Sequence, residues 1–299
     1  SLMKAQLEAT LSQLPNVSEV AISIERAMQE IVDTDNNTGE LGARALAIVG
    51  EDGLELLASS QDSIFEAGKN FFEQSEITEI ALSGESGWIA TLTDGGVFRT
   101  RGDRPGGEVE QIDSRTGIAD IEFDNQEYLW SISRATNSEI IITSPSLEPS
   151  IVSAPWLTGQ SVRAFAIAPG GSKIALLVQG PSRTRVLVSA VVRNLTGTPI
   201  ELAEPLEVAG ELSNPSSVSW IDQITIATVN TAGGSTNALL STIGGTSRQL
   251  TALPGTRKIV AAGPSSQLYL LTETGELFSY RGSAWTPLRQ SIRALALVN

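Results

Sequence analysis

Carboxylates are the side chains with the most obvious capacity for chemistry in this chain. The 299 residues include 34 Asp and Glu and 20 Lys and Arg, but no histidine and no cysteine. Paired carboxylates can hydrolyse glycosidic bonds, and their oxygens bind hard cations such as Ca²⁺. The lack of histidine and cysteine excludes Ser-His-Asp and Cys-His catalysis, HExxH metallopeptidase sites, zinc ribbons and disulfides. Carboxylate catalysis, an oxygen-ligated cation or a non-catalytic role therefore remain.

No spacing of these residues assembles a catalytic or metal site. The polar run 33–39 is similar to part of a calcium loop, but an EF-hand needs glycine and glutamate where Thr38 and Arg44 stand. We interpret this run as a solvated linker. The sialidase Asp-box and the GxGxxG and GxxxxGK[ST] motifs are absent from the sequence. We therefore predict no catalytic residue, no cofactor and no metal ligand.

An arginine-rich segment is the main local exception to a formal net charge of −14. Its members are Arg99, Arg101, Arg104 and Arg115. Arg101 and Arg104 belong to a glycine- and proline-rich loop at 101–107, which could bind a carboxylate or an acidic partner surface, although such a loop is more often an exposed turn. Trp156 follows Pro155 in a connection between predicted strands and could anchor a partner. Arg101, Arg104 and Trp156 are the candidate partner-binding residues.

The charge balance also argues against two kinds of partner. Nucleic acids and anionic membrane surfaces are bound through Lys and Arg, which displace counterions. This chain is acidic and contains only four lysines, so neither partner is predicted. No apolar run approaches the length of about 18 residues that a membrane-spanning helix needs.

The sequence from residue 44 onward has the pattern of an all-β protein. Short apolar runs are separated by Gly, Pro, Asn, Asp and Ser, with almost no helical periodicity. The runs repeat in units of four, the first of which is ITEIALS, GWIATLT, GVFRTR and EVEQID within residues 77–113. Four further units follow, and a repeat of four strands predicts a propeller blade. Trp88, Trp130 and Trp220 lie inside such strands and are expected to pack between blades.

The two ends of this repeat predict how the ring closes. One strand, at 292–298, remains after the fifth unit, whereas three strands, at 45–49, 54–59 and 63–67, precede the first. One strand and three strands make a sixth blade. We therefore predict a six-bladed β-propeller closed by N- and C-terminal strands in one blade. Five or seven blades remain possible if the N-terminal strands pair differently.

The first 43 residues have a different organisation. Leucines at helical spacing are followed by a proline and an alternating strand-like run, which predicts a helix and a strand within residues 3–26. These two elements cannot form a core alone, so we interpret them as the end of an upstream domain and expect the sequence to be part of a longer protein. Residues 27–43 are the predicted linker and residues 44–299 the propeller.

Four segments resemble the LpqB family of actinobacterial lipoproteins, in which a GerMN domain precedes a β-propeller. Three of these are propeller strands with their turns: FDNQEYLWSISR at 123–134, RAFAIAPGGSKIALLV at 163–178, and SVSWID with TIATV within 217–229. The fourth, LEATLSQLPNVSEVAISI at 7–24, is similar to the last helix and strand of a GerMN domain.

The resemblance implies a non-enzymatic extracytoplasmic lipoprotein. Its implied partner is the extracytoplasmic domain of the sensor kinase of the Mtr two-component system, whose signalling in envelope homeostasis and cell division it modulates. The implied location is the cell membrane, through a lipid anchor that this sequence does not contain. The residues alone leave an alternative: a carboxylate-dependent glycan hydrolase or glycan-binding propeller, which would need two acids converging in a funnel.

Overall fold

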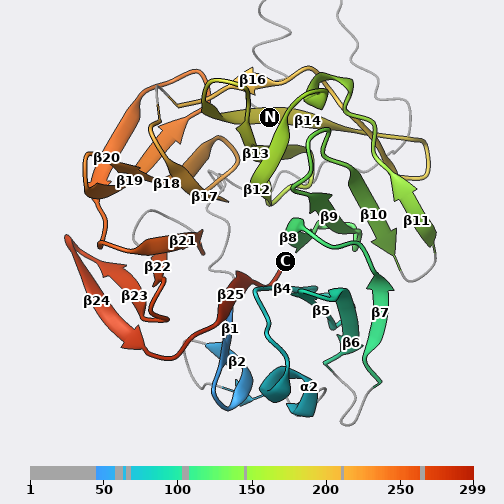
Figure 1. Cartoon of the computed structure of the whole chain (residues 1–299), viewed down its shortest axis with the longest axis horizontal. Helices are drawn as coiled ribbons and strands as arrows, with labels where there is room; N and C mark the ends of the chain where they lie inside the picture. Colours follow the sequence, from blue (N-terminus) through green and yellow to red (C-terminus); the bar gives the residue numbers. More distant parts are fainter. Residues whose placement is uncertain are drawn as a thin grey trace, which may run out of the picture. The chain divides into compact units, whose positions relative to one another are not determined.

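A computed structural model describes residues 45–57, 63–64, 69–102, 108–144, 147–209, 212–262 and 267–299. The predicted GerMN remnant at 3–26, the linker at 27–43 and Arg104 lie outside these residues. Within them, six antiparallel sheets surround a central axis (Figure 1). The prediction of a six-bladed propeller is confirmed.

The first three blades each contain four strands, ordered from the innermost outward. The closing blade consists of β25 (Ala294–Leu297), β1 (Leu46–Gly50), β2 (Gly53–Leu57) and β3 (Ser63–Ile64). Blade 2 consists of β4 (Glu79–Leu82), β5 (Trp88–Thr93), β6 (Gly96–Arg101) and β7 (Glu110–Asp113). Blade 3 consists of β8 (Ile118–Phe123), β9 (Leu129–Ser133), β10 (Ile140–Ser144) and β11 (Leu147–Ile151).

The other three blades continue the ring. Blade 4 consists of β12 (Ser161–Ile167), β13 (Lys173–Gln179), β14 (Thr184–Arg193) and β15 (Pro199–Leu202), with the short β16 (Leu206–Glu207) also paired to β14. Blade 5 consists of β17 (Pro215–Trp220), β18 (Thr225–Ala232), β19 (Ser235–Thr242) and β20 (Ser247–Thr251). Blade 6 consists of β21 (Thr256–Ala261), β22 (Leu268–Thr272), β23 (Leu277–Arg281) and β24 (Ala284–Arg289).

The hydrophobic core lies between the blades. Alternation along each strand gives a blade two apolar faces, and each of the six clusters of buried side chains is shared by two neighbouring blades. Trp130 and Trp220 are buried in the clusters on either side of blade 4. Trp88 is half-buried against the cluster between blades 2 and 3. The predicted packing role of these three tryptophans is confirmed.

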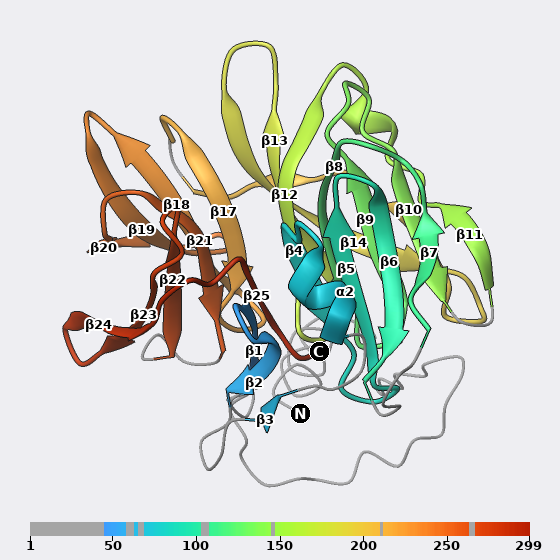
Figure 2. The same ribbon diagram turned by 60° about the horizontal axis from the view of Figure 1, so that its bottom comes forward.

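The one α-helix among the described residues, α2 (Lys69–Gln74), reinforces the junction between the closing blade and blade 2 (Figure 2). Its Phe72 is fully buried in the cluster that these two blades share. Phe71 packs against Phe98 of β6, with 5.3 Å between the ring centroids.

The ring closes by pairing of β25 with β1. The antiparallel register runs from Leu46 opposite Leu297 to Val49 opposite Ala294, as predicted from the strands left over at the two ends of the repeat. Leu295 is completely buried. Beyond β25, the backbone N–H of Asn299 donates to the carbonyl of Leu82 at 3.0 Å, so the chain continues from the closing blade onto β4.

An ion pair between Asp124 and Arg193 joins blades 3 and 4. The fully buried Asp124 carboxylate accepts a hydrogen bond from Arg193 Nη2 at 2.7 Å and another from Trp130 Nε1 at 2.9 Å. The same guanidinium donates to the carbonyls of Gly171 at 3.0 Å and Gly197 at 2.9 Å. Arg193 therefore connects three turns that are distant in sequence.

The antiparallel order of the strands gives the ring two faces. We call the face at which the innermost strands begin the entry face, and the face at which they end the exit face. Connections into each innermost strand and the turns between the second and third strands of a blade lie on the entry face. Asp124, which follows β8, lies on the exit face.

Candidate functional site

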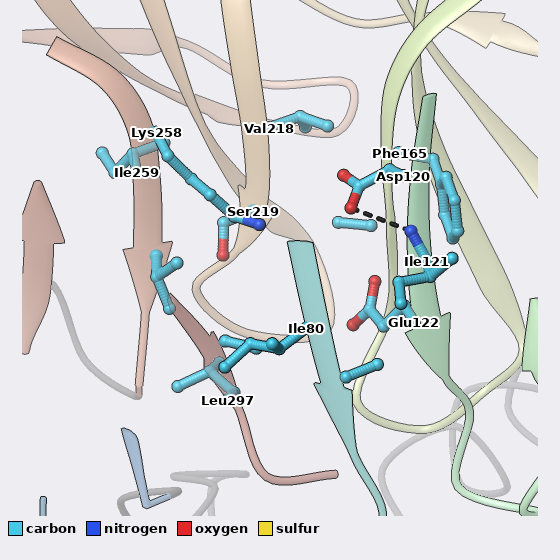
Figure 3. A pocket seen from close by; sticks show the side chains of 14 residues that line it. Ile80, Asp120, Ile121, Glu122, Phe165, Val218, Ser219, Lys258, Ile259 and Leu297 are labelled. Carbon is cyan, nitrogen blue, oxygen red and sulfur yellow. Dashed lines mark hydrogen bonds between the residues drawn. The ribbon is translucent and has the colours of Figure 1, made fainter. Parts of the chain in front are cut away.

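The central channel is the first candidate site because all six blades contribute to it. Its lining comes from the innermost strands β4, β8, β12, β17, β21 and β25, and the cavity has a volume of about 50 Å³. Figure 3 shows Asp120 and Glu122 entering from β8, while Lys258 extends from β21 towards them. The channel is therefore polar at its centre, although most of its lining is apolar.

Two carboxylates and one ammonium group line the channel, and a third carboxylate pairs with the ammonium group. Lys258 Nζ forms an ion pair with the Glu79 carboxylate of β4. Glu122 accepts hydrogen bonds from the backbone N–H of Ile167 at 2.8 Å and from Asn299 Nδ2 at 3.0 Å. Asp120 Oδ1 accepts from the N–H of the next residue at 3.0 Å. These contacts connect blades 2, 3, 4 and 6 and the closing segment.

The channel environment shifts two protonation equilibria. Burial raises the pKa of Asp120 from its ordinary 3.8 to about 7, because the attraction of Lys258 only partly offsets the lost hydration and the repulsion of Glu79 and Glu122. Burial by itself would lower the pKa of Lys258, but the Glu79 and Asp120 carboxylates outweigh it and raise that pKa above its ordinary value. Lys258 therefore stays charged at neutral pH, whereas Asp120 titrates there.

Replacement of Asp120 by asparagine should stabilise the propeller at pH 8 and have little effect at pH 4. The folded protein binds this proton more tightly than the unfolded chain, so its free energy of unfolding falls between pH 4 and 7. Asp120→Asn removes this decrease with pH. We therefore expect the free energy of unfolding at pH 8 to rise by about 2 kcal/mol, after allowance for solvent in the channel. Urea unfolding at both pH values measures it.

Asp94→Asn is the matched control for this prediction, because Asp94 is exposed in the turn between β5 and β6. The difference between each variant and the unmodified chain should be plotted against pH, so that the other titrating groups cancel. An Asp120→Asn difference that stays constant from pH 4 to 8 would contradict the raised pKa.

The channel is too small for a glycan site. Ligand sites typically have volumes of about 300 to 1,000 Å³, whereas this cavity of about 50 Å³ has room for a few water molecules. Within the described part of the chain, no group of three or more Asp and Glu is arranged to hold a metal ion. The channel carboxylates contact Lys258, Asn299 and backbone N–H groups instead.

Arg101 stacks against an aromatic ring on blade 2. Its guanidinium carbon lies 5.3 Å from the centroid of the Trp88 ring, and that of Arg99 lies 4.8 Å from the same ring. Arg99 also forms an ion pair with Glu110 at 3.0 Å. Arg101 thus has a preorganised position near the exit face. A partner contact by Arg101 or Arg104 stays a prediction.

Arg115 is neutralised by carboxylates of blades 2 and 3. It forms ion pairs with Asp113 at 2.7 Å and with Glu139 at 2.9 Å. Burial by itself would raise the pKa of Asp113, but hydrogen bonds and charge from Arg115 and a hydrogen bond from Ser131 hold that pKa below its ordinary value. Arg115 therefore serves the fold, and the predicted basic segment carries less free positive charge than its sequence indicates.

Trp156 lies in the short 3₁₀ helix η1 (Pro155–Leu157), which leads into β12. Its Nε1 donates to the carbonyl of Leu202 at 3.1 Å, and the half-buried ring packs against the cluster between blades 3 and 4. It is on the entry face, whereas Arg101 ends β6 on the exit face. The structure does not bring these two candidates together, and partner binding by Trp156 stays a prediction.

A second cavity, which the sequence did not predict, opens on the entry face. It has a volume of about 530 Å³ and is formed where blade 6, the closing blade and blade 2 meet. We call it the entry groove. Its charged lining residues are Glu51, Glu76, Glu273, Arg257 and Arg293. They come from five separate turns and strand ends, so no local motif marks them.

Comparison with protein families assigns the fold to a known group. Residues 55–294 match the family described as the lipoprotein LpqB β-propeller domain. The chain belongs to this family. The propeller part of the resemblance seen in the sequence is thus confirmed. The match to the LpqB propeller begins after the predicted GerMN remnant, which stays a prediction.

The chain is similar to solved structures at low sequence identity, and a TM-score of 0.60 to one of them indicates a shared fold. A chain in the crystal structure of a nidogen/laminin complex is 11% identical, with a TM-score of 0.60 over 84% of this chain and 97% of that chain. A chain of the Kuenenia stuttgartiensis hydrazine synthase is also 11% identical, with a TM-score of 0.49 over 77% of this chain and 71% of that chain. No curated protein matches the sequence.

The residues described for the LpqB-type propeller include no helix that is long and apolar enough to cross a membrane.

Proposed function

We propose that this LpqB-type propeller is a non-enzymatic binding platform of an extracytoplasmic lipoprotein. The observation that carries the proposal is the family match over residues 55–294. A lipid anchor outside this sequence holds the protein at the cell membrane, with residues 3–26 as the end of a GerMN domain and 27–43 as the linker to the propeller. The platform binds the extracytoplasmic domain of the Mtr sensor kinase and modulates envelope and cell-division signalling.

The geometry supports a platform rather than a catalyst. Six shared clusters hold the blades, and the ring is closed by β-pairing without disulfides. The channel carboxylates are held by a lysine, an asparagine and backbone N–H groups in a cavity of about 50 Å³. A rigid ring with loops on two faces can present a fixed surface to a partner at little entropic cost.

Purified kinase extracytoplasmic domain should bind the intact chain in a pull-down, and the double variant Arg101→Glu/Arg104→Glu should weaken binding about tenfold. Charge reversal at a rim contact acts mainly on association and salt dependence. The affinity is best measured by biolayer interferometry at two salt concentrations.

Arg248→Glu provides the charge-matched control, since Arg248 is exposed on β20 in blade 5. It should bind like the intact chain. Absence of binding by the intact chain rejects the kinase as partner. Equal binding by the double variant and the intact chain leaves the platform in place and rejects the arginine loop as its contact.

A further inference from the structure

The entry groove combines an apolar floor with carboxylates at its rim. Glu51 lies in the turn between β1 and β2, Glu76 precedes β4, and Glu273 lies in the turn between β22 and β23. Ile77 and Ile292, both buried, are the two aliphatic residues of the lining, and we call them its floor. With a volume of about 530 Å³, the groove falls within the range of ligand sites.

The three rim carboxylates are available to a ligand. Each side chain is exposed, and none forms an ion pair or a hydrogen bond with any residue that the structure describes. They add to the surface charge of a chain whose formal net charge is −14. A positively charged ligand group would pair with a rim carboxylate without displacing an existing partner.

The two arginines of the groove donate to backbone carbonyls of its walls, and two positive charges against three carboxylates leave the lining with a formal net charge of −1. Arg293 donates from Nη1 to the carbonyl of Ser75 at 2.9 Å and from Nη2 to those of Gly50 at 3.0 Å and Phe72 at 2.6 Å. Arg257 donates to the carbonyl of Arg293. These bonds fix the start of β25 against blade 6 and α2, so the shape of the groove is built into the closure of the ring.

We propose that the entry groove binds an extended, lysine- or arginine-bearing segment of a partner protein. The carboxylates receive the cationic side chain, and the floor of Ile77 and Ile292 accommodates its aliphatic stem. No aromatic side chain is among the described residues that line the groove, whereas a sugar site relies on aromatic stacking surfaces, so the chemistry favours a peptide over a glycan. The inference rests on the proposed binding role and locates one contact on the entry face.

A fluorescein-labelled peptide of alternating lysine and glycine tests this proposal by fluorescence anisotropy. The intact chain should bind it, and the triple variant Glu51→Gln, Glu76→Gln, Glu273→Gln should bind about tenfold more weakly, since three surface charge contacts together contribute about 1.4 kcal/mol. The corresponding glutamate–glycine peptide should not bind. The melting temperature of the triple variant should stay unchanged, because the three side chains are exposed and have no partner among the described residues.

A second triple variant separates the groove from the general acidity of the surface. Glu85→Gln, Glu108→Gln and Glu148→Gln remove the same charge from exposed glutamates on blades 2 and 3, and binding should remain within about twofold of the intact chain. If both triple variants lose affinity for the peptide equally, or if the intact chain does not bind it, the groove is rejected as a peptide site. If the chain captures the kinase domain but does not bind the lysine peptide, the proposed platform stands and the groove is rejected as a peptide site. If the chain binds the peptide but does not capture the kinase domain, the groove stands and the kinase is rejected as the partner.

Discussion

Deletion of residues 292–299 should leave the ring open and lower the melting temperature by about 15 °C or more, or prevent folding altogether. The deletion removes β25, its pairing with β1 and the buried side chains of Ile292, Ala294 and Leu295. Each large apolar side chain contributes about 1.5 to 3 kcal/mol, and an entire innermost strand accounts for a large share of a total stability of about 5 to 15 kcal/mol. Circular dichroism melts and size-exclusion chromatography measure the effect.

A synthetic peptide of residues 290–299 provides the control for this deletion. If the strand itself closes the ring, the peptide added in excess should restore part of the lost melting temperature, in proportion to the logarithm of its concentration. A peptide with Leu295 replaced by aspartate should not. A truncated chain that melts within about 3 °C of the intact one, which corresponds to roughly 1 kcal/mol, would show that closure contributes little.

Replacement of Arg193 by methionine should destabilise the propeller by about 3 to 5 kcal/mol. The substitution leaves the fully buried carboxylate of Asp124 without its cation and removes the bonds to Gly171 and Gly197. A buried charge that loses its partner is costly because water cannot replace it. Urea unfolding at pH 7 measures the loss, and Arg248→Met on the exposed face of blade 5 should change stability by less than about 0.5 kcal/mol.

A double variant identifies the origin of this loss. Arg193→Met combined with Asp124→Asn removes both charges while keeping acceptor and donor atoms at the aspartate position. If the unpaired carboxylate causes most of the penalty, the double variant should be more stable than Arg193→Met alone. Strict additivity of the two single losses would mean that the two side chains stabilise the ring independently.

The architecture could be predicted because its information is local and periodic. Every blade repeats four short apolar runs, and the leftover strands at the two ends of the repeat indicate six blades. The predicted strand at 292–298 contains β25 (Ala294–Leu297), whose pairing with β1 was expected. Of the third predicted N-terminal strand, 63–67, the structure describes β3 (Ser63–Ile64), and the rest of that range lies outside the described residues.

The candidate sites could not be predicted because their members are distant in sequence. Glu79, Asp120 and Lys258 each occupy an innermost strand that looks ordinary by itself, and only the ring brings them together. The entry groove likewise uses turns from blade 6, the closing blade and blade 2. Arg101 and Trp156 were recognisable by residue type, but no pattern along the chain indicates that they lie on opposite faces.

The pairing of β25 with β1 also has a consequence for biosynthesis. Each hydrophobic cluster is shared by two blades, so a ring that lacks one strand leaves two clusters incomplete at the gap. The strand that fills this gap is the last described strand to leave the ribosome. Until β25 pairs with β1, the nascent propeller therefore exposes apolar side chains of both clusters. Its protection from misassembly depends on how quickly this pairing forms.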